Sequence, residues 1–272
     1  MDWLQSIIYG FICGFSEFIP VSASAQGQLL QTLFDASGND AVRDLLVHIF
    51  SLAAFLIAWR NPLEVLRQTA YISHRRAGGY RHQSRENPDS RFVHACTIPM
   101  LLAMILCYYF TGKASLTTTA FVLFLNGIIL YLPERMLHGN KTARAMSAMD
   151  ALFVGAATAL SVVPGFSRIG MSLSISQMLG ADRKHGLNWA YMLCVPALLL
   201  MIGADLASLV FGGQGLVMTT GFFGYLLIAV FSFAGSYLSV YLMKNIVLHR
   251  GLSAFAYYSW GSALFALILY LL

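Results

Sequence analysis

The stretch "EFIPVSASAQ" (residues 17–26) interrupts an apolar N-terminal segment with a carboxylate, a proline and two hydroxyls. Proline breaks a helix because it lacks an N–H and its ring clashes with the preceding turn. An ionisable side chain is costly inside a membrane and marks a functional candidate there. Glu17, Pro20, Ser22 and Ser24 therefore predict the tip of a broken helix, not an ordinary membrane span.

The composition around this stretch is that of a membrane protein. The chain has 272 residues, of which 58% are hydrophobic and 11% charged, and its mean hydropathy is +0.67. Soluble domains carry about 25% charged residues, and roughly 20 apolar residues cross a bilayer core. We expect one all-α, polytopic membrane domain over residues 1–272. The six predicted spans lie at about 45–59, 93–110, 118–133, 187–210, 219–243 and 254–272.

The net charge of +5 is distributed as a topology signal, so we expect no nucleic-acid partner. Most of the basic residues fall in four loops that lie on one side when each span crosses once, and the positive-inside rule makes that side cytoplasmic. The four basic loops lie on one side only if segments 3–35 and 149–180 each enter the membrane and leave it on the side from which they came. We therefore expect two re-entrant hairpins, a cytoplasmic loop 60–92, and both termini outside.

The two hairpins resemble each other in sequence. "SEFIPVSASAQ" (16–26) and "LSVVPGFSRIG" (160–170) each place a proline between an apolar run and small hydroxylated residues, so that Pro20 matches Pro164. Three predicted spans follow each hairpin, and the hairpins enter from opposite sides. The expected inverted repeats are about 1–135 and about 149–272.

Re-entrant tips have a restricted set of uses. Non-helical backbone at membrane depth must be buried in protein or line a wet cavity, and the helix that restarts after the break offers its N–H groups to an anion. Tips from inverted repeats meet near the midplane in many transporters. A plain packing role for small residues does not explain Glu17 and Arg168.

The second tip has the chemistry of a phosphate site. Arg168 follows Ser167 and precedes Ser172 by one turn, which combines a bidentate guanidinium with hydroxyl donors. Glu17 at the first tip has two open interpretations. It is either a structural partner of an arginine, or a base or metal ligand beside a bound phosphate.

Both tips resemble the signature motifs of the undecaprenyl-diphosphate phosphatase family, also called the bacitracin-resistance protein family. Its motifs read approximately E-G-x-T-E-F-x-P-V-S-S-T-G-H and P-G-x-S-R-S-G-x-T. This chain has C-G-F-S-E-F-I-P-V-S-A-S-A-Q over 13–26 and P-G-F-S-R-I-G-M-S over 164–172. The resemblance implies hydrolysis of a C55 polyprenyl diphosphate to the monophosphate carrier, at the outer face of the bacterial plasma membrane.

The resemblance also implies roles for individual residues. The expected catalytic residues are Glu17, Ser22 and Arg168, and Glu17 is the expected ligand of a divalent cation, Mg²⁺ or Ca²⁺. The expected phosphate-binding residues are Ser24, Gln26, Gly165, Ser167, Arg168 and Ser172. The expected partners are the C55 lipid diphosphate or monophosphate, the membrane, and a second copy of the chain in a homodimer.

Three positions depart from the family motif. Cys13 replaces a glutamate, Ala23 replaces a serine, and Gln26 replaces a histidine, which removes one metal ligand, one nucleophile and one proton carrier. The alternative function is therefore a catalytically weak or inactive member that binds or transports polyprenyl phosphates. His48, inside a predicted span, is the remaining candidate for a base, with a hydrogen-bonded core histidine as its alternative.

Overall fold

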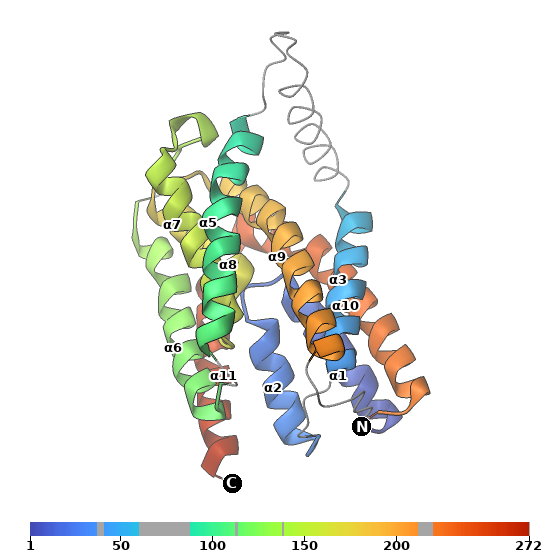
Figure 1. Ribbon diagram of the computed structural model, residues 1–272. Coiled ribbons are helices and arrows are strands. Elements are labelled where there is room, and N and C mark those ends of the chain that lie inside the picture. Colours follow the sequence, from blue (N-terminus) through green and yellow to red (C-terminus); the bar gives the residue numbers. More distant parts are fainter. Residues whose placement is uncertain (37–40, 60–87, 112–113, 138, 212–219, 272) are drawn as a thin grey trace, which may run out of the picture.

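The computed structural model describes residues 1–36, 41–59, 88–111, 114–137, 139–211 and 220–271 (Figure 1). Within these ranges the secondary structure is helical, apart from one isolated bridge between Lys141 and Ala181. Among the described residues, six helices are long and apolar enough to cross a membrane. They are α3 (Ala41–Ala58), α5 (Pro88–Thr111), α6 (Leu116–Tyr131), α9 (Arg183–Phe211), α10 (Phe222–Arg250) and α11 (Ser253–Leu271). The predicted all-helical fold with six spans is confirmed.

A helical hairpin precedes α3. Its first helix, α1 (Trp3–Glu17), starts with a capping box between Asp2 and Gln5 and ends three residues before Pro20. The chain restarts as α2 (Ala23–Leu33), whose first turn is capped by the Ser22 hydroxyl. The proline thus breaks the helix where the sequence predicts, and α2 returns toward the end of the molecule that holds the N-terminus (Figure 1).

The second hairpin precedes α9 and has the same order of parts. It consists of α7 (Ala148–Ala159), the short η3 (Leu160–Val162) and α8 (Arg168–Met178), which is capped by Ser167. Gly165, between η3 and α8, has a φ of +116°, a conformation that side chains with a Cβ rarely adopt. That either hairpin is re-entrant in a membrane stays a prediction.

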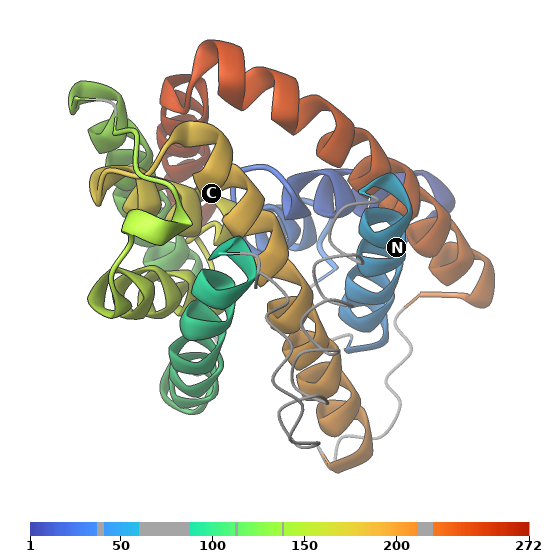
Figure 2. The ribbon, with the colours of Figure 1, turned by 90° about the horizontal axis from the view of Figure 1, so that it is seen from above.

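The helices of the two halves pack reciprocally. α1 packs against α10, and α7 packs against α5, so the first helix of each half contacts the second long helix of the other. α3 contacts α9, and α6 contacts α11. Figure 2 shows α10 running along the edge of the bundle beside α1. The division into inverted repeats stays a prediction.

Small residues allow α1 and α10 to approach closely. A Cβ on Gly14 would collide with the backbone of Ser232. The Ser232 hydroxyl donates to the Gly10 carbonyl oxygen (3.1 Å), and the Ser236 hydroxyl donates to the Gly14 carbonyl oxygen (2.9 Å). Close backbone contact with serine hydrogen bonds is a common way for membrane helices to associate, and here it fixes the position of the first hairpin.

The two ends of the molecule differ. The two chain ends marked in Figure 1 lie at the same end of the molecule, and their predicted place outside the cell stays a prediction. At the other end Glu134, in η1 (Leu132–Arg135), accepts hydrogen bonds from Arg183 (3.0 Å) and from the backbone of Leu252 (2.8 Å). A further 3-10 turn, η2 (Ala143–Ala145), leads to α7. Most of the predicted basic loop, 60–87, lies outside the described residues.

Candidate active site

The tips of the two hairpins contact each other directly. The Gly165 N–H donates to the Ser22 hydroxyl (3.0 Å), and the Ser167 hydroxyl donates to the Ile19 carbonyl oxygen (3.2 Å). All four residues belong to the segments that break the helices. The two motifs, 143 and 148 positions apart at these contacts, therefore form one structural unit, as the sequence predicts for meeting tips.

Asn126 of α6 holds this unit in place. Its amide nitrogen donates to the Pro20 carbonyl oxygen (3.4 Å) and to the Ser259 hydroxyl (3.0 Å), and its amide oxygen accepts from the Ser167 N–H (3.0 Å). The side chain is fully buried. The sequence interpretation missed Asn126, although a lone asparagine in the apolar run "TTTAFVLFLNGIILY" was a usable signal.

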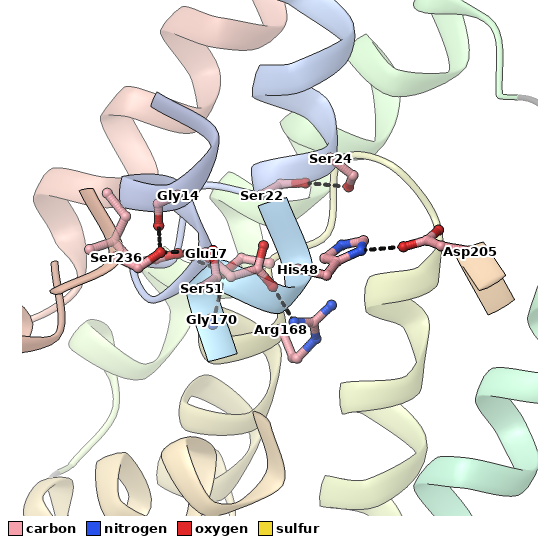
Figure 3. Close-up of polar contacts among 12 residues, drawn as sticks. Gly14, Glu17, Ser22, Ser24, His48, Ser51, Arg168, Gly170, Asp205 and Ser236 are labelled. Atoms are coloured by element: carbon pink, nitrogen blue, oxygen red, sulfur yellow. Dashed lines mark hydrogen bonds and ion pairs between the residues drawn. The ribbon is translucent and has the colours of Figure 1, made fainter. Parts of the chain in front are cut away.

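Glu17 and Arg168 form an ion pair between the end of α1 and the start of α8 (Figure 3). Their side chains are 4% and 8% exposed. The Arg168 Nε–H has no hydrogen-bond partner among the described residues. A buried pair must be compensated by good geometry and further hydrogen bonds to be favourable. The ion pair with Glu17 thus leaves one buried donor of Arg168 unsatisfied.

The ion pair lines a cavity of about 610 Å³, within the range of small-ligand sites. Ala23 and Ser24 line it from the first turn of α2, and Ser167 lines it from the cap of α8. Two helices of 11 residues each thus begin at its wall. Because helix N-termini carry partial positive charge and unpaired N–H groups, the cavity suits a phosphate group.

The predicted site residues divide into two sets. Glu17, Ser24, Ser167 and Arg168 line the cavity together. The predicted residues outside its lining are Ser22, Gln26, Gly165 and Ser172. Of the three residues that differ from the family motif, Cys13 and Ala23 line the cavity and Gln26 does not.

Ser22 and Ser172 lie in the protein beside the cavity. The Ser22 hydroxyl, besides its bond from Gly165, accepts from the Ala25 N–H (3.4 Å) and lies 3.3 Å from the Ser24 hydroxyl. Its contacts join the two tips. Ser172 is fully buried in α8, and its hydroxyl has no partner among the described residues. The catalytic role of Ser22 and the phosphate contact of Ser172 stay predictions.

Gln26 faces α11. The Tyr258 hydroxyl donates to its amide oxygen (3.1 Å), and its amide nitrogen donates to the Val21 carbonyl oxygen (3.3 Å) and to the Ser262 hydroxyl (3.4 Å). It lines a second cavity of about 380 Å³ between α2 and α11. Its predicted phosphate contact stays a prediction.

A histidine–aspartate pair also lines the main cavity. His48 Nδ1 of α3 lies 2.7 Å from Asp205 Oδ2 of α9 (Figure 3). Asp44, one turn before His48 on α3, accepts from the Tyr9 hydroxyl (3.2 Å), which in turn accepts from the Gln31 amide (3.0 Å). The sequence interpretation considered His48 but missed Asp205, because 157 positions separate the two.

A divalent cation such as Mg²⁺ or Ca²⁺ needs several oxygen ligands. The described residues contain no group of three or more His, Cys, Asp or Glu side chains that could hold a metal ion. Glu17 would be a single carboxylate ligand, and one of its oxygens accepts from Arg168. The protein side chains alone do not fit a metal centre, and the predicted cation stays a prediction.

Comparison with known proteins gives one consistent result. A family model described as bacitracin resistance protein BacA matches residues 6–265. The undecaprenyl-diphosphatase of Methanobrevibacter smithii is 29% identical over 276 residues, which cover 96% of this chain and 95% of that protein. The undecaprenyl-diphosphatase of Carboxydothermus hydrogenoformans is 28% identical over 271 residues, which cover 96% and 94%.

Proposed function

The chain belongs to the bacitracin resistance protein family, and on that premise we propose that it is an undecaprenyl-diphosphate phosphatase. It would remove the terminal phosphate of the C55 lipid diphosphate and return the monophosphate carrier to cell-wall synthesis. The observation that carries the proposal is the buried Glu17–Arg168 ion pair, which lines a cavity at the start of α8.

Arg168 is the main phosphate ligand in this proposal. Its planar guanidinium can make two parallel hydrogen bonds to a phosphate, which a lysine cannot. Ala23 and Ser24, in the first turn of α2, line the same cavity and carry a hydroxyl and backbone N–H groups. These groups would bind the diphosphate and stabilise the negative charge that develops on it during hydrolysis.

Glu17 would change partner when the lipid binds. Without substrate its carboxylate neutralises Arg168. A diphosphate competes with it for the same guanidinium, and the displaced carboxylate would then lie beside the bound phosphate. From that position Glu17 would exchange a proton with a phosphate oxygen, which is the acid–base role that the motif implies.

We propose a site near the midplane that opens to the outer face of the bacterial plasma membrane. The cavity extends from the tips to Thr32, Ala114 and Asp205. They belong to the last turn of α2, the segment just before α6 and the second half of α9. These parts lie toward the end that carries both termini (Figure 1), and the basic-residue pattern predicts that this end is outside. A diphosphate head group would thus enter from the outer side while its prenyl chain stays in the lipid.

A binder or transporter of polyprenyl phosphates is the second candidate, and two positions in the cavity favour it. Ala23 offers no hydroxyl and Cys13 no carboxylate at the wall where the family motif has both. Gln26 cannot carry a proton near pH 7, and it is bound to Tyr258. Such a protein would keep the phosphate ligands and have lost the chemistry.

Phosphate release from a C55 diphosphate by the purified protein separates the two candidates. The measurement should be made with Mg²⁺, with Ca²⁺ and with a chelator, beside direct lipid binding. We expect binding and measurable release that Arg168→Ala abolishes. Binding without release above the rate of the alanine variant would exclude the phosphatase and leave the binder or transporter.

A further inference from the structure

His48 and Asp205 form a pair that lines the cavity, and neither residue is one of the proposed phosphate ligands. His48 comes from α3 and Asp205 from α9, two helices that pack against each other. The side chains are 15% and 17% exposed, and both line the cavity that holds Arg168. In Figure 3 the imidazole lies between Asp205 and the Glu17–Arg168 pair.

The hydrogen bond to Asp205 determines which ring nitrogen of a neutral imidazole carries the hydrogen. An ionised carboxylate can only accept, so the hydrogen in the 2.7 Å contact belongs to Nδ1 of His48. In the neutral ring Nε2 is then the acceptor. No described residue makes a hydrogen bond to Nε2, and the ring borders the cavity. The pair therefore presents one basic nitrogen to a ligand in the cavity.

We infer that His48 is the general base of the hydrolysis and that Asp205 is its positioning residue. The inference rests on the proposed phosphatase function. Nε2 takes a proton from a water molecule, the water oxygen forms a bond to the terminal phosphorus, and the bridging P–O bond breaks. Its electron pair stays on the lipid monophosphate. The imidazolium, stabilised by Asp205, then gives its proton to the released inorganic phosphate.

A purely structural role is the alternative, since the same contact joins α3 to α9. Loss of a structural contact would lower the thermal unfolding temperature and lipid binding together with turnover. Loss of a base would lower kcat with little change in KM or in lipid affinity. The loss of kcat, compared with the changes in lipid affinity and in the unfolding temperature of the full-length protein, distinguishes the two roles.

The test is phosphate release from a C55 diphosphate by wild type, His48→Gln, Asp205→Asn and the double variant. His94→Gln is the matched control, because His94 contacts the Ser90 carbonyl oxygen on α5 and does not line the cavity. We expect His48→Gln to lower kcat roughly 10²- to 10⁴-fold, the usual contribution of a general base. KM should change less than about threefold, and the double variant should be no slower than His48→Gln.

Chemical rescue provides an independent measurement. His48→Ala leaves space for free imidazole, which should restore part of the lost turnover, whereas it should not accelerate Arg168→Ala. Equal kcat in wild type and His48→Gln, or a loss that follows lipid affinity and resists imidazole, overturns the role of His48 while the phosphatase proposal stands. A wild type that binds the lipid without releasing phosphate overturns both.

Discussion

Arg168 donates a hydrogen bond to Glu17, where the start of one helix meets the end of another. The two residues lie 151 positions apart in the chain. Glu17 ends α1 and Arg168 begins α8, so the ion pair joins the tips of the two hairpins. Because both side chains line the cavity, the pair is also the place where a phosphate would enter. The same contact thus stabilises the resting protein and competes with the ligand.

Replacement of Arg168 should remove binding. We expect Arg168→Ala to lower kcat/KM by at least roughly 10²-fold, the usual cost of losing a donor to developing charge. Arg168→Lys should also be poor, because an ammonium cannot make the planar two-donor contact. Isothermal titration calorimetry with the lipid and a phosphate-release assay measure the effect of both variants. Arg135→Ala is the control, since Arg135 is exposed and contacts Tyr131 away from the cavity. Unchanged lipid affinity in Arg168→Ala would show that Arg168 is only a partner of Glu17.

Replacement of Glu17 should separate binding from turnover. Glu17→Gln keeps the shape of the side chain and removes the charge that competes with phosphate for Arg168. We expect roughly tenfold tighter lipid binding, corresponding to about 1.4 kcal/mol, together with slower phosphate release. The free energy of unfolding should fall, because Arg168 loses its buried counter-ion. Weaker lipid binding in a folded Glu17→Gln protein contradicts competition and indicates a direct ligand role.

The sequence predicts the helix breaks and the membrane spans around this site, because the residues that signal them act locally. Pro20 and Pro164 break helices wherever they lie, and the length of each apolar run sets the spans. Arg168 and Glu17 stand out because charge is costly in an apolar segment. These features need no knowledge of the partner helix, so the six spans and the contact between tips follow from the chain alone.

The remaining parts depend on packing between distant segments. His48 and Asp205 meet only because α3 lies against α9, and Asn126 reaches the tips only from α6. Gln26 lies three residues into α2. Its side chain faces α11 because the helix starts at Ala23, and a shift of the start by one residue would rotate it by about 100°. The family motif therefore locates the cavity more reliably than it assigns each side chain to it.

Asn126 should contribute to stability through the tips. Asn126→Leu has a similar volume but leaves the Ser167 N–H and the Pro20 carbonyl oxygen without their partner. A buried polar group left unpaired costs about 1–3 kcal/mol, so we expect a lower unfolding temperature in detergent and weaker lipid binding. Asn245→Ala, at an exposed position of α10, is the control. Equal unfolding temperatures for Asn126→Leu and wild type would contradict the proposed contribution of Asn126.

Gly14 should tolerate no larger residue. In Gly14→Ala the new Cβ would overlap the Ser232 backbone, so α1 and α10 must separate, at a cost of about 1–3 kcal/mol. Gly203→Ala is the matched control, because a Cβ there meets nothing within 4 Å. Alanine is also the better helix former. We expect thermal unfolding to show a loss for Gly14→Ala and no loss for Gly203→Ala, and similar losses in both would contradict the close packing.

Cys13 should decide the response to metal. Cys13 and Glu17 are four residues apart on α1, hence on one face of the helix, and both line the cavity. Mg²⁺ and Ca²⁺ prefer oxygen ligands, so the thiol is a poor second ligand. In Cys13→Glu two carboxylates face the bound diphosphate, and without a cation they repel each other.

We therefore expect Mg²⁺ or Ca²⁺ to raise both phosphate release and the unfolding temperature of Cys13→Glu more than those of wild type. A chelator should remove the gain. Cys13→Gln has the same size without the charge and should show no gain, and Gln26→His should add nothing because that side chain faces Tyr258. If Cys13→Glu and Cys13→Gln respond to the cation alike, the carboxylate at this position does not bind it. In that case the loss of the motif glutamate does not explain any weak turnover of the natural chain.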